Sequence, residues 1–281
     1  NMEIKVFIAV LIAALVHALW NGMVKVHKNK YIAVSAIVLG HVPLCLIVVL
    51  ITPMPSMESV PYIVASAIIH QGYQWFLLSA YKVGDYTKVY PVARGTGPVV
   101  VTIIAIAFLN TSLSNFELLG ILLISLGIFS LAFKYRTSKK NKKGIYLAIW
   151  TGIFIGGYSL VDGTGARISG SPLSYMSWAF ILNAMIFPFL LSFFNQRYIL
   201  KKTLKDAPNL FWIGGTASSV VYLIIVWAYT QAPIPLVSAL RETSVILAIL
   251  IGYILLKEKL TIYKVISILI IFFGILSLKF F

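Results

Sequence analysis

Two arginines, Arg94 and Arg241, lie deep inside long apolar segments of this sequence. A charged side chain inside a membrane costs roughly 3 kcal/mol or more, so it normally faces a water-filled cavity or an oppositely charged partner. Two such guanidinium groups beside one pathway could bind the anionic group of a solute or close a gate. The alternative that the residues leave open is a structural ion pair with Glu242, Asp162 or Asp85.

Polar and aromatic side chains recur in the same apolar segments, at spacings that place them on one helix face. His17 and Asn21, like His70 and Gln74, are four residues apart and therefore share a face. Buried polar groups need partners or water, so these residues predict a polar cavity. The histidines are interpreted as hydrogen-bonding groups, with proton coupling through either one as the alternative. The aromatic walls of this cavity are predicted to come from Trp20, Trp75, Tyr90, Tyr158 and Tyr229.

Two further segments interrupt the apolar runs. Asp162 stands among glycines in residues 161–167, where it could bind a coupling ion, pair with Arg167 or Arg241, or end a helix in a wet loop. Residues 90–98 contain two prolines and two glycines, which predicts a broken or loosened helix, or a packing kink. Backbone groups freed in this way are tolerated in a membrane where they line a cavity.

The elements that position these residues must be membrane helices. Hydrophobic residues make up 60% of the 281 residues and charged residues only 11%, against about 25% charged residues in a soluble domain. Lipid is therefore the solvent, and continuous apolar runs do not fit the alternating pattern of a membrane β-barrel. The predicted fold class is all-α integral membrane, with ten transmembrane helices over residues 4–24, 31–52, 60–81, 88–109, 115–134, 144–163, 171–194, 208–230, 234–256 and 262–280.

The basic residues predict the orientation of these helices. The net charge is +15, and its carriers lie between the apolar runs, which favours membrane topology over nucleic-acid binding. Alternate connections hold 18 lysines and arginines, whereas the other side, termini included, holds 3. The positive-inside rule then places the basic loops in the cytoplasm and both termini outside, in a multi-pass protein of the cytoplasmic (inner) membrane. In this orientation we expect Arg94 in the inner leaflet and Arg241 in the outer leaflet.

The two halves of the chain resemble each other. Arg94-Gly95-Thr96 aligns with Arg241-Glu242-Thr243, and residues 126–131 align with residues 273–278. Each half holds five helices, and because five is odd the halves must be inverted relative to each other. Inverted repeats are typical of secondary transporters, whose substrate site lies at the repeat interface. The predicted units are a first five-helix repeat at 2–134, a basic cytoplasmic linker at 135–143 and a second five-helix repeat at 144–281.

Several motifs resemble the drug/metabolite transporter superfamily, in its EamA-domain branch. They extend over nearly the whole chain and include Leu19-Trp20-Asn21, Ala228-Tyr229 and residues 235–240 and 252–260. The final glutamate of the pattern matches Glu258, whereas its counterpart in the first half is Thr111, so that half departs from the pattern. The resemblance implies a ten-helix transporter with a central cavity, which moves metabolites such as amino acids, amines or sugar conjugates.

The predicted function is secondary transport of a small polar or charged metabolite by alternating access. Residues 90–96 and 158–163 are also similar, more loosely, to a permease subgroup associated with phosphonate use. An anionic or zwitterionic solute, such as an amino acid, an organic acid or a phosphonate, is therefore expected. One alternative is a carrier of a cationic or quaternary amine held by aromatic side chains, which would require Glu242 or Asp162 to face the cavity. The other is an intramembrane enzyme.

No catalytic motif is present in the sequence, and the prediction is that the protein is not an enzyme and uses no cofactor or metal. The expected partners are a small-molecule substrate, the lipid bilayer and a coupling proton or counter-substrate, without nucleic acid. Both a monomer and a homodimer are consistent with the sequence. The predicted substrate-binding residues are Arg94, Arg241, His17, Trp20, Asn21, His70, Gln74, Trp75, Tyr90, Tyr158, Tyr229, Glu242 and Asp162.

Overall fold

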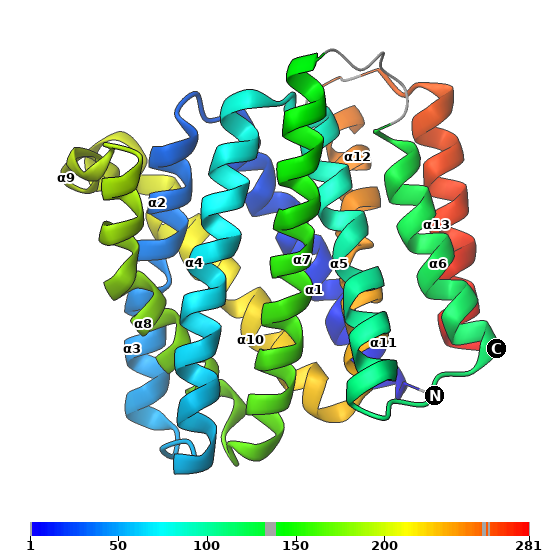
Figure 1. Ribbon diagram of the computed structural model, residues 1–281, viewed down its shortest axis with the longest axis horizontal. Coiled ribbons are helices and arrows are strands. Elements are labelled where there is room, and N and C mark those ends of the chain that lie inside the picture. Colours follow the sequence, from blue (N-terminus) through cyan, green and yellow to red (C-terminus); the bar gives the residue numbers. More distant parts are fainter. Residues whose placement is uncertain (1, 133–138, 255–256, 258, 281) are drawn as a thin grey trace.

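The computed structural model describes residues 2–132, 139–254, 257 and 259–280, and over this part of the chain it is helical and contains no strand (Figure 1). Eight helical segments in it are long and apolar enough to cross a membrane. The prediction of an all-α membrane protein is therefore confirmed. These eight segments are Ile4–Val26, Lys30–Ile51, Thr87–Phe108, Lys142–Ile168, Pro172–Phe193, Leu210–Gln231, Ile234–Ile254 and Ile262–Phe280.

Five of these eight segments are single helices, and the other three each consist of two helical pieces. Single helices form α1 (Ile4–Val26), α5 (Tyr86–Phe108), α7 (Lys139–Ile168), α8 (Pro172–Phe193) and α13 (Ile262–Phe280). Three segments consist of two pieces each, namely α2 (Lys30–Gly40) with α3 (Val42–Ile51), a π-helical turn (Leu210–Gly215) with α10 (Thr216–Gln231), and α11 (Ile234–Arg241) with α12 (Ser244–Ile254).

Two more of the predicted spans are helical, but one is too polar and the other too short to count among these eight membrane-crossing segments. Helix α4 (Val60–Val83) has 24 residues, but His70, Gln71 and Gln74 make it more polar than the others. Helix α6 (Asn115–Ser130) is apolar but has only 16 residues. The short α9 (Leu200–Asp206) and the 3₁₀ turns Met57–Ser59 and Arg197–Ile199 complete the described elements.

Helix ends follow the turn-forming residues of the sequence. The Asn29 side chain accepts hydrogen bonds from the backbone amides of Tyr31 and Ile32 and so begins α2. Ser114 and Glu117 form a reciprocal capping box at the start of α6. Both devices satisfy backbone amides that have no partner inside the helix, which explains why the sequence places the helix boundaries well.

The proline-rich segment does not break its helix, so of the alternatives predicted for residues 90–98 the broken helix is wrong. Helix α5 runs continuously from Tyr86 to Phe108 with Pro91 and Pro98 inside it. Close packing against α7 accounts for this difference. A Cβ placed on Gly152 would lie 2.7 Å from the carbonyl oxygen of Ala93, so the two helix backbones nearly touch at this point. Tight contact along the neighbouring helix thus offsets the hydrogen bonds that the prolines remove.

A helix break occurs instead in the second half of the chain, between α11 and α12. The amides of Glu242 and Thr243 bond to the carbonyls of Ala239 and Leu240, three residues earlier, at 3.0 and 3.1 Å. This tighter winding changes the direction of consecutive side chains relative to a regular α-helix. It therefore affects where Arg241 and Glu242 point.

The helices form three groups across the molecule (Figure 1). Helices α2, α3 and α8 pack at one side, and α6 packs against α13 at the other. Helices α6 and α13 are antiparallel, because Ser277 near the end of α13 donates to the carbonyl of Phe116 at the start of α6. Helices α1, α4, α5, α7, α10 and α11 lie between these groups and surround the centre.

Candidate substrate-binding cavity

A cavity of about 140 Å³ lies at the centre of the helix bundle. Its walls come from α1, α4, α5, α7, α10 and α11, with α2 and α8 in addition. The first six are the helices that carry the residues predicted to form the cavity. The predicted residues that line it are His17, Trp20, Asn21, His70, Gln74, Tyr90, Arg94, Tyr158 and Arg241.

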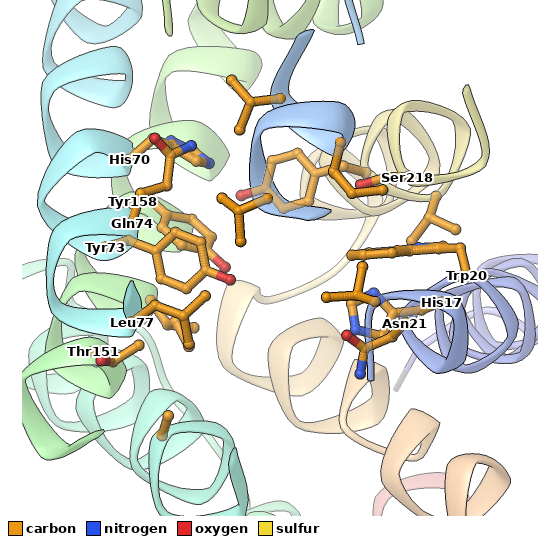
Figure 2. Close-up of a pocket in the computed structure, with 18 of the residues that line it drawn as sticks. His17, Trp20, Asn21, His70, Tyr73, Gln74, Leu77, Thr151, Tyr158 and Ser218 are labelled. Atoms are coloured by element: carbon orange, nitrogen blue, oxygen red, sulfur yellow. The ribbon is translucent and has the colours of Figure 1, made fainter. Parts of the chain in front are cut away.

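Aromatic rings line the cavity from opposite sides (Figure 2). On one side His70 of α4 stacks on Tyr158 of α7, with ring centroids 4.2 Å apart. On the opposite side His17 and Trp20 of α1 meet edge to face at 4.8 Å. The faces and edges of these rings favour contact with flat or apolar parts of a solute. The nitrogen and hydroxyl groups at the ends of the same side chains can form hydrogen bonds that orient the solute.

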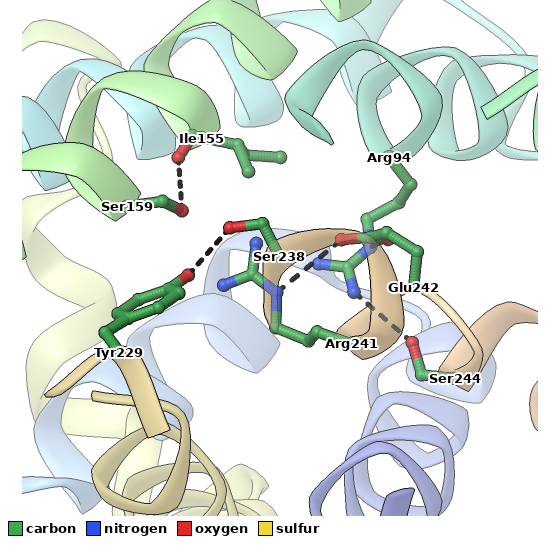
Figure 3. A network of polar contacts seen from close by, with 8 residues as sticks. All are labelled: Arg94, Ile155, Ser159, Tyr229, Ser238, Arg241, Glu242 and Ser244. Atoms are coloured by element: carbon green, nitrogen blue, oxygen red, sulfur yellow. Dashed lines mark hydrogen bonds and ion pairs between the residues drawn. The ribbon is translucent and has the colours of Figure 1, made fainter. Parts of the chain in front are cut away.

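The charged part of the cavity is a cluster of two arginines and one glutamate (Figure 3). Arg94 Nε lies 2.7 Å from Glu242 Oε2, and Arg94 Nη2 donates a hydrogen bond to Ser244 Oγ at 3.3 Å. Arg241 Nε lies farther away, 3.5 Å from Glu242 Oε1. All three charged side chains are buried, and Glu242 is fully buried. Two guanidinium groups therefore share one carboxylate, which leaves one unit of positive charge beside the cavity.

The arginine side chains converge, although they come from different helices, α5 and α11. Both lie against the same carboxylate, because long side chains extend from both helices toward one point. Consecutive residues such as Arg241 and Glu242 point about 100° apart around a regular α-helix and about 120° apart where the winding is 3₁₀-like, as it is after Leu240. The contact of Arg241 Nε with Glu242 Oε1 is accordingly long, at 3.5 Å.

Four predicted site residues do not line the cavity. Trp75 lies at the outside of the bundle, where its ring packs against Phe193 at 5.2 Å. Tyr229 is buried beside the cavity, and its hydroxyl lies 3.1 Å from Ser238 Oγ. Glu242 lies behind the two arginines, and Asp162 accepts a hydrogen bond from the hydroxyl of Tyr222 at 2.7 Å.

Several cavity residues were not predicted from the sequence. Tyr73 lies on the same face of α4 as His70 and Gln74, so helical spacing was a usable signal for it. His41 sits at the break between α2 and α3, and its Nε2 lies 3.1 Å from Ser218 Oγ. Tyr222 of α10 faces the cavity together with Ser218, four residues earlier, so helical spacing was a usable signal for it as well. No sequence pattern marks the position of His41.

A larger opening of about 550 Å³ lies next to the central cavity, between α1, α5, α12 and α13. Asn21 and Tyr90 line both spaces. Lys25, Lys259 and Lys264 line the larger opening only, so it lies at the basic ends of these helices. Solutes could therefore reach the central cavity from the end of the bundle where the lysines gather.

Helices that are long and apolar enough to span a membrane and that surround a polar, charged cavity define a multi-pass membrane protein. Residues 142–279 match the model of the EamA-like transporter family. The second half of the chain therefore matches that family, and the resemblance to the drug/metabolite transporter superfamily is confirmed. Members of the family are transporters of small molecules and not enzymes. Within the described residues, no group of three or more histidine, cysteine or acidic side chains could hold a metal ion.

No curated protein matches the chain. A solved structure titled only "Crystal structure of protein" superimposes with a TM-score of 0.76 at 13% sequence identity, over 97% of this chain and 98% of that one. At this identity the likeness shows that the two chains share a fold. Glu258, the residue that carried part of the family resemblance, lies outside the described residues, as does part of the predicted linker 135–143.

Proposed function

We propose that this protein is a secondary transporter that moves a small anionic or zwitterionic metabolite through the central cavity by alternating access. The single observation that carries the proposal is the unbalanced positive charge of the Arg94–Glu242–Arg241 cluster. A buried cation without its own counter-ion is costly in a membrane. A carboxylate, phosphate or phosphonate group of the solute would supply the missing negative charge.

Arg241 is the proposed anchor for this anionic group. Arg94 already has a close carboxylate and a serine hydroxyl as partners. Arg241 has only the looser 3.5 Å contact, and its Nε has no hydrogen-bond partner among the described residues. Arg94 is therefore assigned mainly to holding Glu242 and the break in helix α11–α12, whereas the guanidinium of Arg241 is available to the solute.

Ten membrane spans are proposed, with α4 and α6 added to the eight segments described above. A polar α4 is compatible with a membrane because His70 and Gln74 face the cavity and not lipid. The 16 residues of α6 cover about 24 Å at 1.5 Å per residue. This length falls a few residues short of a typical span, so the flanking loop residues would lie within the interface.

The contact between α6 and α13 supports inverted repeats at 2–134 and 144–281. A Cβ on Gly127 would meet Ile271 Cγ1 at 2.6 Å, and a Cβ on Gly274 would meet Ile124 Cγ1 at 2.8 Å. Gly274 and Ile271 are the residues that align with Gly127 and Ile124 in the repeat. Each helix therefore presents the same surface to the other, as a twofold axis between two inverted halves requires.

The wider packing has the same symmetry. Helix α4 packs against α7, and its counterpart α10 packs against α1. Helix α5 packs against α7, and its counterparts α11 and α12 pack against α1. Exchanging the two halves therefore reproduces the principal helix contacts. The family match at 142–279 also nearly coincides with the proposed second repeat.

The positions of the cavity residues support a conformation that faces the basic side. Val24, Leu77 and Tyr81 lie at the basic ends of α1 and α4, and all three line the cavity. At the opposite end Val10 and Leu236 are fully buried in the apolar core. With basic ends in the cytoplasm and both termini outside, the outer half is closed. Alternating access would open it while the inner half closes.

A binding screen followed by transport tests the proposal. Purified protein is heated with succinate, methylphosphonate, alanine or choline, and the probes that stabilise the folded protein are identified. Each stabilising probe is then tested for uptake into proteoliposomes. Stabilisation and uptake of an anion or zwitterion, both lost in Arg241→Met, are expected. Stabilisation by choline alone would favour the cation carrier, which the structure does not favour because neither Glu242 nor Asp162 lines the cavity.

A further inference from the structure

Asp162 is a buried acid that the anion-binding cluster does not use. Its side chain is fully buried in α7. Oδ2 accepts the hydrogen bond from Tyr222, while Oδ1 has no hydrogen-bond partner among the described residues. No lysine, arginine or histidine in the described part of the chain lies within ion-pair distance of it, unlike Glu242 with its two arginines. Glu242 therefore has positively charged partners, whereas Asp162 has none at ion-pair distance among the described residues.

An ionised carboxylate in such a place is unfavourable. Moving a charge out of water costs several kcal/mol unless a counter-ion and hydrogen bonds compensate it. The close hydrogen bond from Tyr222, with the hydroxyls of Ser66 and Tyr175 nearby and no counter-ion at ion-pair distance, does not provide that compensation. A carboxyl group that binds a proton loses the charge and gains an O–H donor, so the geometry favours the protonated acid in this conformation.

Titratable and polar groups face Asp162 from four helices. His70 and Ser66 come from α4, Tyr175 from α8, Tyr222 from α10 and Arg241 from α11. Arg241 is the one permanently charged group of this set. His70 already uses Nδ1 in a 2.9 Å contact with the carbonyl oxygen of Ser66, so this nitrogen is oriented toward the α4 backbone.

One side chain separates Asp162 from the cavity. Tyr222 lines the cavity, and its hydroxyl reaches the carboxyl group. Its ring meets His70 and Tyr158 edge to face, at 5.9 and 5.8 Å. Asp162 also lies six residues before Ile168, the end of α7, which is about 9 Å from the outer end of that helix. The carboxyl group thus lies on the proposed pathway, between the cavity and the closed outer half.

We propose that Asp162 is the coupling site for one proton per transport cycle. The carboxylate binds a proton when the outer half is open, retains it behind Tyr222 in the conformation described here, and releases it toward the cytoplasm past Tyr222 and His70. The only bond that forms or breaks is the O–H bond of the carboxyl group. This inference rests on the proposed alternating-access function, and it adds a proton gradient as the energy source.

Infrared spectroscopy of the full chain in lipid tests proton binding without any substrate. We expect the carbonyl-stretching band of a protonated carboxylic acid at neutral pH, its loss in Asp162→Asn and a frequency shift in Tyr222→Phe. Asp85→Asn is the matched control, because Asp85 is an exposed helix cap that asparagine can replace. A band that is missing in the wild type, or that survives in Asp162→Asn, would overturn the proposal. Loss of the band when sodium chloride is added at constant pH would assign the site to a sodium ion instead.

Transport tests the coupling. In proteoliposomes, a pH difference of one unit should drive up to about tenfold accumulation of succinate or methylphosphonate when one proton is coupled. Asp162→Asn, which resembles the protonated acid, should exchange the probe across the membrane at equal pH but not accumulate it. Accumulation by Asp162→Asn, or wild-type accumulation that ignores the pH gradient, contradicts coupling. Absence of any probe movement in the wild type would instead count against the transport function, and the infrared result would still decide whether Asp162 binds a proton.

Discussion

Replacing Arg241 by methionine should separate substrate binding from folding. The variant would leave Arg94 and Glu242 as a one-to-one pair at 2.7 Å, so no buried charge loses its partner. Exchanging a buried charged group for an apolar one of similar size is often neutral when no ion is left unpaired. We therefore expect the free energy of unfolding of Arg241→Met to change by no more than about 1 kcal/mol.

Anion binding should be affected much more strongly. Removing one partner of a buried charge pair costs about 2–5 kcal/mol of binding free energy, which is roughly a thirtyfold to several-thousandfold increase in Kd. The assay is calorimetric titration of purified protein with the anion that stabilises the wild type. Arg241→Lys keeps the charge but not the planar fork of donors, so it should recover part of the lost affinity.

Arg94→Met is the contrasting variant. It removes the close ion pair with Glu242 and the hydrogen bond to Ser244, and it leaves Glu242 with only the 3.5 Å contact to Arg241. Breaking a buried pair from one side costs about 3–5 kcal/mol, so this variant should unfold at clearly lower temperature or denaturant concentration. The reasoning is refuted if Arg241→Met binds the anion as tightly as the wild type, or if it loses as much stability as Arg94→Met.

Three further outcomes follow from the packing. Gly274→Ala should destabilise the protein by about 1–3 kcal/mol, because the added Cβ would overlap Ile124. Gly22→Ala, which has open space around the added Cβ, should be neutral or stabilising by up to about 1 kcal/mol. Thermal unfolding measures both changes in stability. Tyr158→Ala should weaken probe binding about tenfold or more through loss of a buried aromatic wall, while Trp75→Ala, outside the cavity, should leave calorimetric Kd values unchanged. Arg167→Gln removes two charge-assisted bonds, to the carbonyls of residues 229 and 232 at 2.9 Å, and should cost about 1.5–3 kcal/mol of unfolding free energy in denaturant titration.

The sequence was informative where local spacing decides the outcome. Apolar runs and turn-forming residues predicted the helices, since hydrogen bonding in lipid leaves the backbone few alternatives. His70 and Gln74 were correctly placed on a common face because a helix fixes the direction of residues four apart. The contribution of α2 through His41 was missed, since it depends on a helix break that no motif marks.

Contacts between distant segments were less predictable. Glu242 was correctly named among the candidate partners of Arg94. The direction in which the Glu242 side chain points, however, depends on the tight winding at the end of α11. Trp75 has the same residue type as Trp20, yet it packs against Phe193 at the surface. Residue type and period indicate which side chains share a face, but the neighbouring helices determine whether that face meets lipid or the cavity.

The charge of the cavity arises from a difference between otherwise similar halves. Arg94 and Arg241 occupy equivalent positions in the repeat, but the residue that follows is Gly95 in the first half and Glu242 in the second. A Cβ on Gly95 would lie 3.1 Å from the ring of Phe129, so a glutamate there would require this ring to shift. Two glutamates would neutralise two arginines and leave an electrically balanced site. One glutamate leaves a net positive charge, and this single departure from symmetry is what makes the cavity suited to an anion.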